Sequence, residues 1–241
     1  MATQRALSVV IPAFNEAQRL PSTLAAVSAY LASQPDLCPA EVIIVDDGSR
    51  DATARVAEQF VAPAGLTCSV LRLASNRGKG AAVREGMAAS LGAWVLVSDA
   101  DLATPIEEVR TLLAAGAAVA VGSRAVDRAM IERRQPLRRD LLGRLFNFAL
   151  RVLRLTRLKD TQCGFKLLDG ELARRLAAVM RLDRFAFDIE LLARAGACGA
   201  TVAEVPVRWS HVDDSRVRPL RDGLRMVVDA LRLRWWLWLG R

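Results

Sequence analysis

The sequence is poor in the residue types that build most metal and redox sites. Its 241 residues include one histidine, one tyrosine and four cysteines, and aromatic residues make up only 5% of the chain. The cysteines are scattered, with no CxxC pair and no histidine pair nearby, which argues against a zinc site and predicts reduced thiols. Because apolar residues reach 52% with so few aromatics, the core is predicted to consist of alanine, valine, isoleucine and leucine.

Two kinds of segment and two nucleotide-binding motifs are also missing. No stretch of about 18 apolar residues is free of charge, so no transmembrane helix is predicted, and Met1 to Leu7 shows no secretory signal. The first predicted strand is followed by Ala13-Phe14-Asn15-Glu16 rather than by GxGxxG, and Gly78-Lys79 is followed by glycine rather than by serine or threonine. These departures exclude a dinucleotide-binding fingerprint and a P-loop.

Charge is divided unevenly along the chain. Residues 1–123 carry nine basic and twelve acidic side chains, a net charge of −3, whereas residues 124–241 carry twenty-five basic and fourteen acidic ones, a net charge of +11. This division predicts a catalytic front half joined to a surface that attracts anions. Membranes and phosphorylated substrates fit that surface. Nucleic acid is not predicted as a partner, because the basic residues lack interleaved aromatics.

Short apolar runs alternate with helix-like segments through the front half. Strands are predicted near residues 7–12, 41–46, 69–73, 93–98 and 118–122, with helices between them. Alternation of this kind is typical of an α/β fold whose mostly parallel sheet is covered on both faces. Because polar motifs follow these strands, we expect the motifs to gather at one edge of the sheet, where such folds bind ligands.

Two carboxylates follow the fourth of these strands. The apolar run 95–97 passes through Ser98 directly into Asp99 and Asp101. Two like charges that lie close together require a cation between them, or one of them must lose its charge. A divalent ion that carries a phosphate is the simplest such arrangement. An acidic turn that caps the helix near Ile106 is the alternative, and this motif alone does not decide between the two.

Several motifs stand in a characteristic order along the chain. Those of the front half are Val9-Val10-Ile11-Pro12-Ala13-Phe14-Asn15-Glu16, Val45-Asp46-Asp47-Gly48-Ser49, Asn76-Arg77-Gly78-Lys79-Gly80, Asp99-Ala100-Asp101 and Gly122-Ser123-Arg124. Their order and spacing resemble the family 2 glycosyltransferases of GT-A fold. Those of the back half are Asp160-Thr161-Gln162-Cys163-Gly164-Phe165-Lys166, Phe187-Asp188-Ile189-Glu190 and Glu204-Val205-Pro206-Val207-Arg208-Trp209. They look like the dolichyl-phosphate β-glucosyltransferase branch of that family, over about residues 7–235 in all.

The resemblance implies a site for a nucleotide-diphosphate sugar. In such a site Asp99 and Asp101 bind Mg²⁺ or Mn²⁺ and, with Arg124, form the catalytic set. For Lys79, a solvated lysine at a helix start is the alternative. Mannosyltransferase relatives often carry a glutamine near the metal where this chain has Ala103. The residues implied to bind the donor are Pro12, Phe14, Glu16, Val45, Asp47, Lys79, Asp99, Ala100, Asp101 and Arg216.

The implied acceptor is a polyprenyl phosphate, held by Arg124, Arg138, Asp188 and Glu190, although the last two may instead organise the site through hydrogen bonds. A lipid monophosphate has a second pKa of about 6, so it is already anionic at neutral pH and needs no general base. The only histidine, His211, is therefore not required as one. The implied reaction is an inverting hexose transfer.

Glucose from UDP-glucose is the first choice of sugar, and mannose from GDP-mannose is the second. A cell-wall or capsule glycan transferase is an alternative, and it would need a carboxylate base such as Asp188. A degenerate transferase that acts as a membrane-binding scaffold is an alternative of another class.

Residues 136–156 and the C-terminal residues 218–241 are predicted to form amphipathic helices at a membrane surface. Apolar side chains fill more than half of the first helical wheel, and the second segment ends in Trp235-Trp236-Leu237-Trp238 beside arginines. Packing of either helix into a globular core is the alternative.

Residues 1–217 are expected to form one domain, with a nucleotide-sugar half (1–125) and an acceptor half (126–217). The protein is expected to be cytoplasmic and bound peripherally to the inner face of the membrane. The sequence predicts no oligomeric state.

Overall fold

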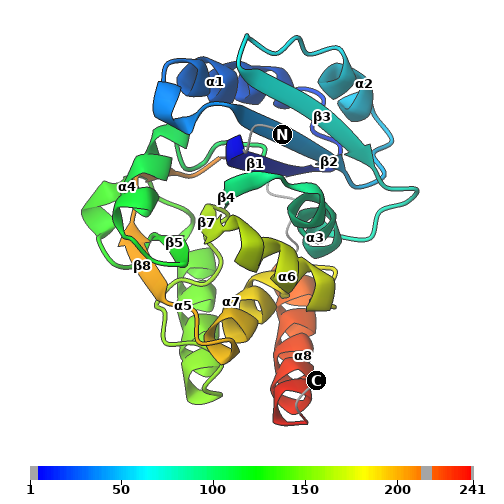
Figure 1. The fold of residues 1–241 in the computed structure, drawn as a ribbon. Coiled ribbons are helices and arrows are strands. Elements are labelled where there is room, and N and C mark those ends of the chain that lie inside the picture. The colour runs from blue at the N-terminus through cyan, green and yellow to red at the C-terminus, as the bar shows by residue number, and fades with distance from the viewer. Residues whose placement is uncertain (1–4, 213–218, 240–241) are drawn as a thin grey trace.

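A seven-stranded sheet forms the centre of the protein, as seen in a computed structural model that describes residues 5–212 and 219–239 (Figure 1). Its strand order is β3-β2-β1-β4-β7-β5-β8, and all neighbours run parallel except at β7, which is antiparallel to both β4 and β5. A second sheet pairs β6 (Ile131–Arg133) with β9 (Trp209–Ser210). The strands of the central sheet are β1 (Arg5–Ala13), β2 (Ala40–Asp46), β3 (Leu66–Arg72), β4 (Gly92–Val97), β5 (Val119–Ser123), β7 (Lys166–Asp169) and β8 (Val202–Pro206).

Helices cover both faces of the central sheet, and its strands alternate apolar side chains between the two layers. Val42 and Ile44 of β2 pack into one layer, with α1, α2 and α4, whereas Ile43 and Val45 pack into the other, with α3, α6 and α7. This two-sided burial is why the strands read as continuous apolar runs. The helices are α1 (Leu20–Ala32), α2 (Thr53–Glu58), α3 (Lys79–Ala89), α4 (Val109–Ala114), α5 (Leu137–Val152), α6 (Gly170–Val179), α7 (Phe187–Ala197) and α8 (Pro219–Trp238), with 3-10 turns η1 (Pro35–Leu37), η2 (Ile106–Glu108) and η3 (Arg128–Met130).

The helices α5 and α8 lie side by side at the end of the molecule farthest from α1 and α2 (Figure 1). They share a third apolar cluster with α7, in which Leu150, Ile189 and Leu233 are buried. Within the described part of the chain, no helix combines the length and the apolar character needed to cross a bilayer.

The predicted α/β fold with a mostly parallel sheet is confirmed. All five strands predicted from the sequence are present, with ends within three residues of the predicted ones. The first amphipathic helix is shorter than the predicted 136–156. It ends at Val152 because Leu153 caps it and Arg154 adopts the left-handed φ of 55°. The division of the chain at residues 125 and 217 stays a prediction.

The antiparallel strand β7 is the feature that the alternating pattern does not predict. It lies between β4 and β5, with Leu167 opposite both Leu96 and Ala120. Because β7 runs against its neighbours, the segment that precedes it, residues 160–165, reaches the edge where β1, β2, β4 and β5 end. The motif in that segment therefore joins the front-half motifs at one edge of the sheet.

Helix α3 packs directly on the sheet at Gly86, and this contact yields a test of the core. A Cβ atom at Gly86 would collide with Val10 Cγ1 and lie 3.0 Å from Val45 Cγ2. Alanine normally stabilises a helix interior by about 1 kcal/mol relative to glycine. We expect Gly86→Ala to do the opposite and lower the free energy of unfolding by roughly 1–3 kcal/mol, because the site is overpacked. Urea unfolding measures the change.

Gly143→Ala on α5 is the matched control, since a Cβ there would meet nothing within 4 Å. This variant should raise the free energy of unfolding by up to about 1 kcal/mol. Changes of the same sign in both variants would show that α3 does not pack on the sheet as described.

Candidate active site

The acidic pair follows β4 at the carboxyl edge of the sheet. Between Asp99 and Asp101, the carbonyl oxygen of Ala100 accepts a hydrogen bond of 2.6 Å from Thr23 Oγ1, which anchors the turn. The Ala103 N–H donates to Asp101 Oδ1 at 3.0 Å. Burial, together with the charge of Asp99, raises the pKa of Asp101. The pair thus carries more negative charge than its surroundings balance, which is the chemistry of a cation site.

Lys79 supplies positive charge to this pair. Its ammonium group forms an ion pair with the Asp99 carboxylate. Burial lowers the pKa of Lys79, but the charges of Asp99, Asp188 and Asp101 outweigh burial and the pKa is raised. Lys79 is the first residue of α3 and follows Gly78, whose φ of 115° favours glycine. Lys79 therefore lies at the acidic pair rather than in solvent.

Asp47 holds the loop that leads to Lys79. Its carboxylate accepts hydrogen bonds from Arg77 N–H at 2.7 Å, Gly78 N–H at 2.8 Å and Asn76 Nδ2 at 2.9 Å. Burial raises the pKa of Asp47, although the two backbone hydrogen bonds oppose the shift. Asp47 thereby positions Lys79, and its predicted contact with a nucleotide stays a prediction.

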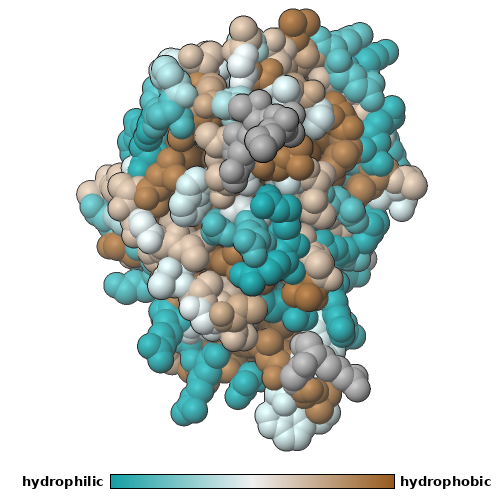
Figure 2. All heavy atoms as spheres, in the orientation of Figure 1, coloured by the Kyte–Doolittle hydropathy of each residue, from teal (hydrophilic) through white to brown (hydrophobic). Residues whose placement is uncertain are grey.

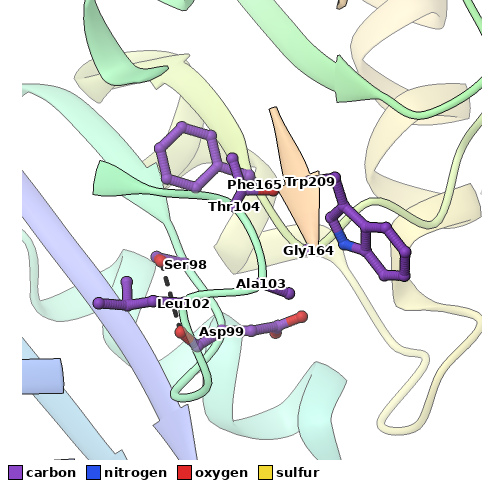
Figure 3. A pocket seen from close by; sticks show the side chains of 8 residues that line it. All are labelled: Ser98, Asp99, Leu102, Ala103, Thr104, Gly164, Phe165 and Trp209. Carbon is purple, nitrogen blue, oxygen red and sulfur yellow. Dashed lines mark hydrogen bonds between the residues drawn. The ribbon is translucent and has the colours of Figure 1, made fainter. Parts of the chain in front are cut away.

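A pocket opens beside Asp99 (Figure 3). In Figure 3 the Asp99 carboxylate projects toward Gly164 and Trp209, whereas Leu102 points the opposite way. Gly164 makes room for this carboxylate, because a Cβ atom there would collide with Asp99 in its present position. The lining residues are Ser98, Asp99, Leu102, Ala103, Thr104, Gly164, Phe165 and Trp209.

Trp209 is a site residue that sequence reasoning missed. It belongs to β9, and its ring lies 5.3 Å from the Arg124 guanidinium and 6.0 Å from the His211 ring. The signal was present, because Trp209 ends the motif 204–209 that carries part of the family resemblance. A motif alone does not indicate which of its residues faces the site.

Arg124 is immobilised by Asp160. Its Nε and Nη2 atoms donate to the two Asp160 oxygens at 2.7 and 2.8 Å, and its backbone N–H donates at 3.1 Å. Burial alone would raise the pKa of Asp160, but the Arg124 charge and these hydrogen bonds lower it to about 2. Among the residues described, Arg124 Nη1 has no hydrogen-bond partner, and the Arg124 side chain is 24% exposed.

The predicted donor residues after β1 lie partly buried at the same edge. Pro12 is near the end of β1, and Phe14 and Glu16 follow the strand. The Glu16 backbone N–H donates to Thr53 Oγ1 at 2.8 Å, and the Glu16 carboxylate lies 3.4 Å from Arg19 Nη1. The first of these contacts ties the loop after β1 to the start of α2.

Of three other predicted residues, one is buried in the core and two lie outside the part that the structure describes. Val45 is fully buried beneath Gly86 of α3, so its side chain has no surface for a nucleotide, contrary to the prediction that it lies beside one. Arg216 falls within 213–218, outside the described residues. Arg138 lies on α5, and its side chain is also outside the described part.

Glu190 is an internal hydrogen-bond acceptor rather than a surface for the acceptor substrate. It is fully buried on α7, and its Oε2 atom accepts from the Arg181 and Leu182 N–H groups at 2.9 and 2.7 Å. Its Oε1 atom accepts from Arg194 Nε at 2.8 Å. This burial contradicts the predicted direct contact with the acceptor. The alternative, in which Glu190 organises the acceptor site through hydrogen bonds, stays a prediction.

Asp188 is likewise turned inward. It is 4% exposed, and its Oδ1 atom lies 2.6 Å from the buried Lys166 Nζ. Burial raises the pKa of Asp188 in spite of the nearby Lys166 and Lys79 charges. Asp188 thus stabilises two lysines beneath the acidic pair, which corrects the prediction that it touches the acceptor.

The open α/β sheet carries an acidic pair, a lysine and an arginine at its carboxyl edge, an arrangement typical of a site for an anionic substrate. The family model described as "Glycosyl transferase family 2" matches residues 8–176. The chain belongs to glycosyl transferase family 2 and is a glycosyltransferase.

Curated relatives match almost the whole chain. It is 36% identical to "Dolichyl-phosphate beta-glucosyltransferase" of Dictyostelium discoideum, over 97% of this chain and 75% of that protein. The proteins of the same name from Homo sapiens and Drosophila melanogaster are 38% and 39% identical, over 95% and 94% of this chain and 74% of each relative.

Solved structures with the same fold are more distant in sequence. Glucosyl-3-phosphoglycerate synthase of Mycobacterium tuberculosis, in complex with phosphoglyceric acid, has a TM-score of 0.68 at 22% identity, over 95% of this chain and 80% of that one. The mannosyltransferase PcManGT of Pyrobaculum calidifontis, in complex with GDP-Man and Mn²⁺, has a TM-score of 0.56 at 16% identity, over 100% of this chain and 66% of that one. These similarities confirm the GT-A fold.

The Arg124–Asp160 pair predicts a pH dependence of stability. The pKa of Asp160 is about 2 in the folded protein against an ordinary value of 3.8. A carboxyl group whose pKa is lower in the folded than in the unfolded protein stabilises the fold at pH values above its unfolded pKa. This stabilisation is lost as the pH falls from about 4 to about 2. We expect about 2 kcal/mol of the wild-type stability to be lost in that window for this reason, whereas Asp160→Asn should lack this loss.

Urea unfolding at a series of pH values measures both proteins, and Asp229→Asn on α8 controls for the removal of one carboxyl elsewhere. The difference in unfolding free energy between wild type and Asp160→Asn should shrink as the pH falls. A difference that stays constant from pH about 5 to about 2 would contradict the ion pair.

Proposed function

We propose that this protein transfers glucose from UDP-glucose to a polyprenyl phosphate of the dolichyl type, with inversion at the sugar carbon. The observation that carries the proposal is 36–39% identity to proteins named dolichyl-phosphate beta-glucosyltransferase, over 94–97% of the chain. The site supports it, since Lys79 and Arg124 bring positive charge to the edge where Asp99 lies.

The donor side needs a cation besides Lys79. Asp99 and Asp101 provide hard carboxylate oxygens, which Mg²⁺ and Mn²⁺ prefer. Asp101 uses one oxygen for the Ala103 N–H, and its other oxygen has no hydrogen bond within the described residues. No group of three His, Cys, Asp or Glu side chains in the same described part is arranged for a metal, so the remaining ligands would be phosphate and water. The pair fits such an ion, which when bound would neutralise the leaving diphosphate.

The acceptor side has a simpler task. A lipid monophosphate at neutral pH is a nucleophile without further deprotonation. The protein must bring this anion to an anionic donor, and Arg124 meets that need because Asp160 fixes its orientation while Nη1 stays available. Holding the two substrates in place makes their bimolecular reaction effectively unimolecular, which lowers its entropic cost.

The alternatives are less well supported. A glycan transferase would require a carboxylate base, but Asp188 is buried and paired with Lys166. A scaffold without activity would not require the space that Gly164 leaves for the Asp99 carboxylate. Nor would it require an Arg124 side chain held in place by Asp160. Mannose from GDP-mannose remains the second choice of donor.

A radiolabel assay tests the proposed reaction. With UDP-[¹⁴C]glucose, a short polyprenyl phosphate and Mn²⁺, label should enter the organic phase, and Asp99→Asn should slow this transfer by at least about 100-fold because charge stabilisation is lost. Asp36→Asn, whose carboxylate pairs with Arg110 on the surface, should retain the wild-type rate.

Thermal melting of all three proteins excludes unfolding as the cause of a lost rate. Label that enters the organic phase only from GDP-mannose would favour the second donor. No labelled lipid from either nucleotide sugar would refute lipid transfer.

We propose further that α5 and α8 seat the protein on the cytoplasmic face of a membrane. Both helices expose apolar side chains next to arginines, and Figure 2 shows hydrophilic and apolar groups together at this end of the molecule. Trp235 and Trp238 are exposed near the end of α8, where tryptophan suits the membrane interface. The exposed apolar residues are Leu137, Leu141, Leu142, Leu145, Phe148 and Val152 on α5, and Leu224, Val227, Val228, Leu231, Trp235 and Trp238 on α8.

Vesicle sedimentation tests this second proposal. The double variant Leu141→Gln/Leu145→Gln removes two exposed apolar groups one turn apart on α5. Its partition onto vesicles that contain anionic lipid should fall at least about tenfold, because each leucine contributes on the order of 1 kcal/mol when it leaves water. The control Val61→Gln/Leu91→Gln removes two exposed apolar residues outside these helices and should bind as wild type does. Equal binding of both double variants would contradict seating through α5.

A further inference from the structure

Two ion pairs, each between a lysine and an aspartate, lie at the acidic pair. Lys166 pairs with Asp188, and Lys79 pairs with Asp99, which precedes Asp101 by two residues. The charge of Asp188 also acts on Lys79 and raises its pKa, so the two ion pairs are electrostatically linked. Two ammonium groups thus face three carboxylates, and the uncompensated negative charge lies at the Asp99–Asp101 end.

The backbone on both sides of Lys79 is closely packed. A Cβ atom on Gly78 would lie 2.5 Å from the Asp183 carbonyl oxygen, and one on Gly80 would collide with the Leu182 carbonyl oxygen. The two glycines therefore pack in close contact with the backbone of the segment before α7. The Lys79 ammonium reaches Asp99 from this anchor and also lies 5.8 Å from the centroid of the Phe187 ring.

The Lys79 ammonium group is paired with the same Asp99 carboxylate that a divalent ion would bind. A metal ion that approached Asp99 in the absence of substrate would meet an ammonium group at the same carboxylate, and like charges at such distances repel by several kcal/mol at an effective dielectric constant of about 20. A donor diphosphate changes this balance, because it offers anionic oxygens to the ion and to Lys79 alike.

We propose that Lys79 is an internal counter-ion that excludes divalent metal from Asp99 until the donor diphosphate arrives, so that metal and donor bind cooperatively. This inference rests on the proposed donor site. When Lys79 leaves Asp99 for the diphosphate, Asp188 remains close enough to balance part of its charge. By linkage, the factor by which the nucleotide tightens metal binding equals the factor by which the metal tightens nucleotide binding.

The test measures Mn²⁺ binding to the full chain by electron paramagnetic resonance, without reference to catalysis. In the wild type, UDP should lower the Mn²⁺ dissociation constant by at least about tenfold. In Lys79→Met, which keeps the aliphatic length and removes the charge, the free protein should bind Mn²⁺ about tenfold more tightly than the free wild type. UDP should bind this variant more weakly, and the coupling between UDP and Mn²⁺ should shrink.

Arg77→Met is the matched control. It removes the same charge two residues away, where Arg77 pairs with Glu85 at 3.1 Å and with Asp183 at 3.8 Å rather than with the acidic pair. This variant should bind Mn²⁺ as the wild type does. Thermal melting shows that each variant is folded.

Unchanged Mn²⁺ binding in Lys79→Met, an equal change in Arg77→Met, or no Mn²⁺ binding in any of the proteins would overturn the inference. The measurements without nucleotide do not depend on the identity of the donor or acceptor. Tighter Mn²⁺ binding in Lys79→Met together with no transfer to polyprenyl phosphate would therefore support the counter-ion and refute only the proposed reaction.

Discussion

Negative charge gathered at one sheet edge is the constraint on which the site depends. Asp99 and Asp101 follow β4, and the turn between them is held by Thr23. Such a pair is tolerated only where positive charge is near, and the fold brings Lys79 to it from the start of α3. Among the described residues, Lys79, Lys166 and Arg124 are each paired with a carboxylate, so the site is a set of ion pairs with an excess of negative charge at Asp99 and Asp101 rather than a basic patch.

The reversed strand β7 determines how the two halves of the chain meet. Because it runs against β4 and β5, the loop before it lies at the carboxyl edge, with Gly164 against Asp99 and Asp160 against Arg124. The alternating strand–helix pattern predicted the five front strands and the edge where their motifs meet. It could not predict β7, since a strand of four residues, of which only Leu167 and Leu168 are apolar, is too short for its pattern to report its direction.

Buried carboxylates show a second limit of sequence reasoning. Asp47, Asp160 and Glu190 all accept backbone N–H groups from loops, and the sequence does not distinguish such a carboxylate from one that faces a ligand. The difference is set by where neighbouring N–H groups point after folding, because a buried carboxylate must satisfy its oxygens. Trp209 escaped notice for a related reason, since its exposure to the pocket depends on the pairing of β9 with β6.

The loop 160–165 also connects the site to the two helices proposed to meet the membrane. Thr161 donates two hydrogen bonds to Asn147 Oδ1 on α5, and Gln162 Nε2 lies 3.6 Å from the Met226 sulfur on α8. The same loop carries Asp160, which fixes Arg124. If α5 and α8 seat on a membrane as proposed, a lipid-borne phosphate would approach the donor only to the depth that these helices allow. The side-chain contacts of this one short loop would then set the height of Arg124 above the bilayer. Repacking Asn147 or Met226 would in that case alter acceptor transfer without touching the donor site.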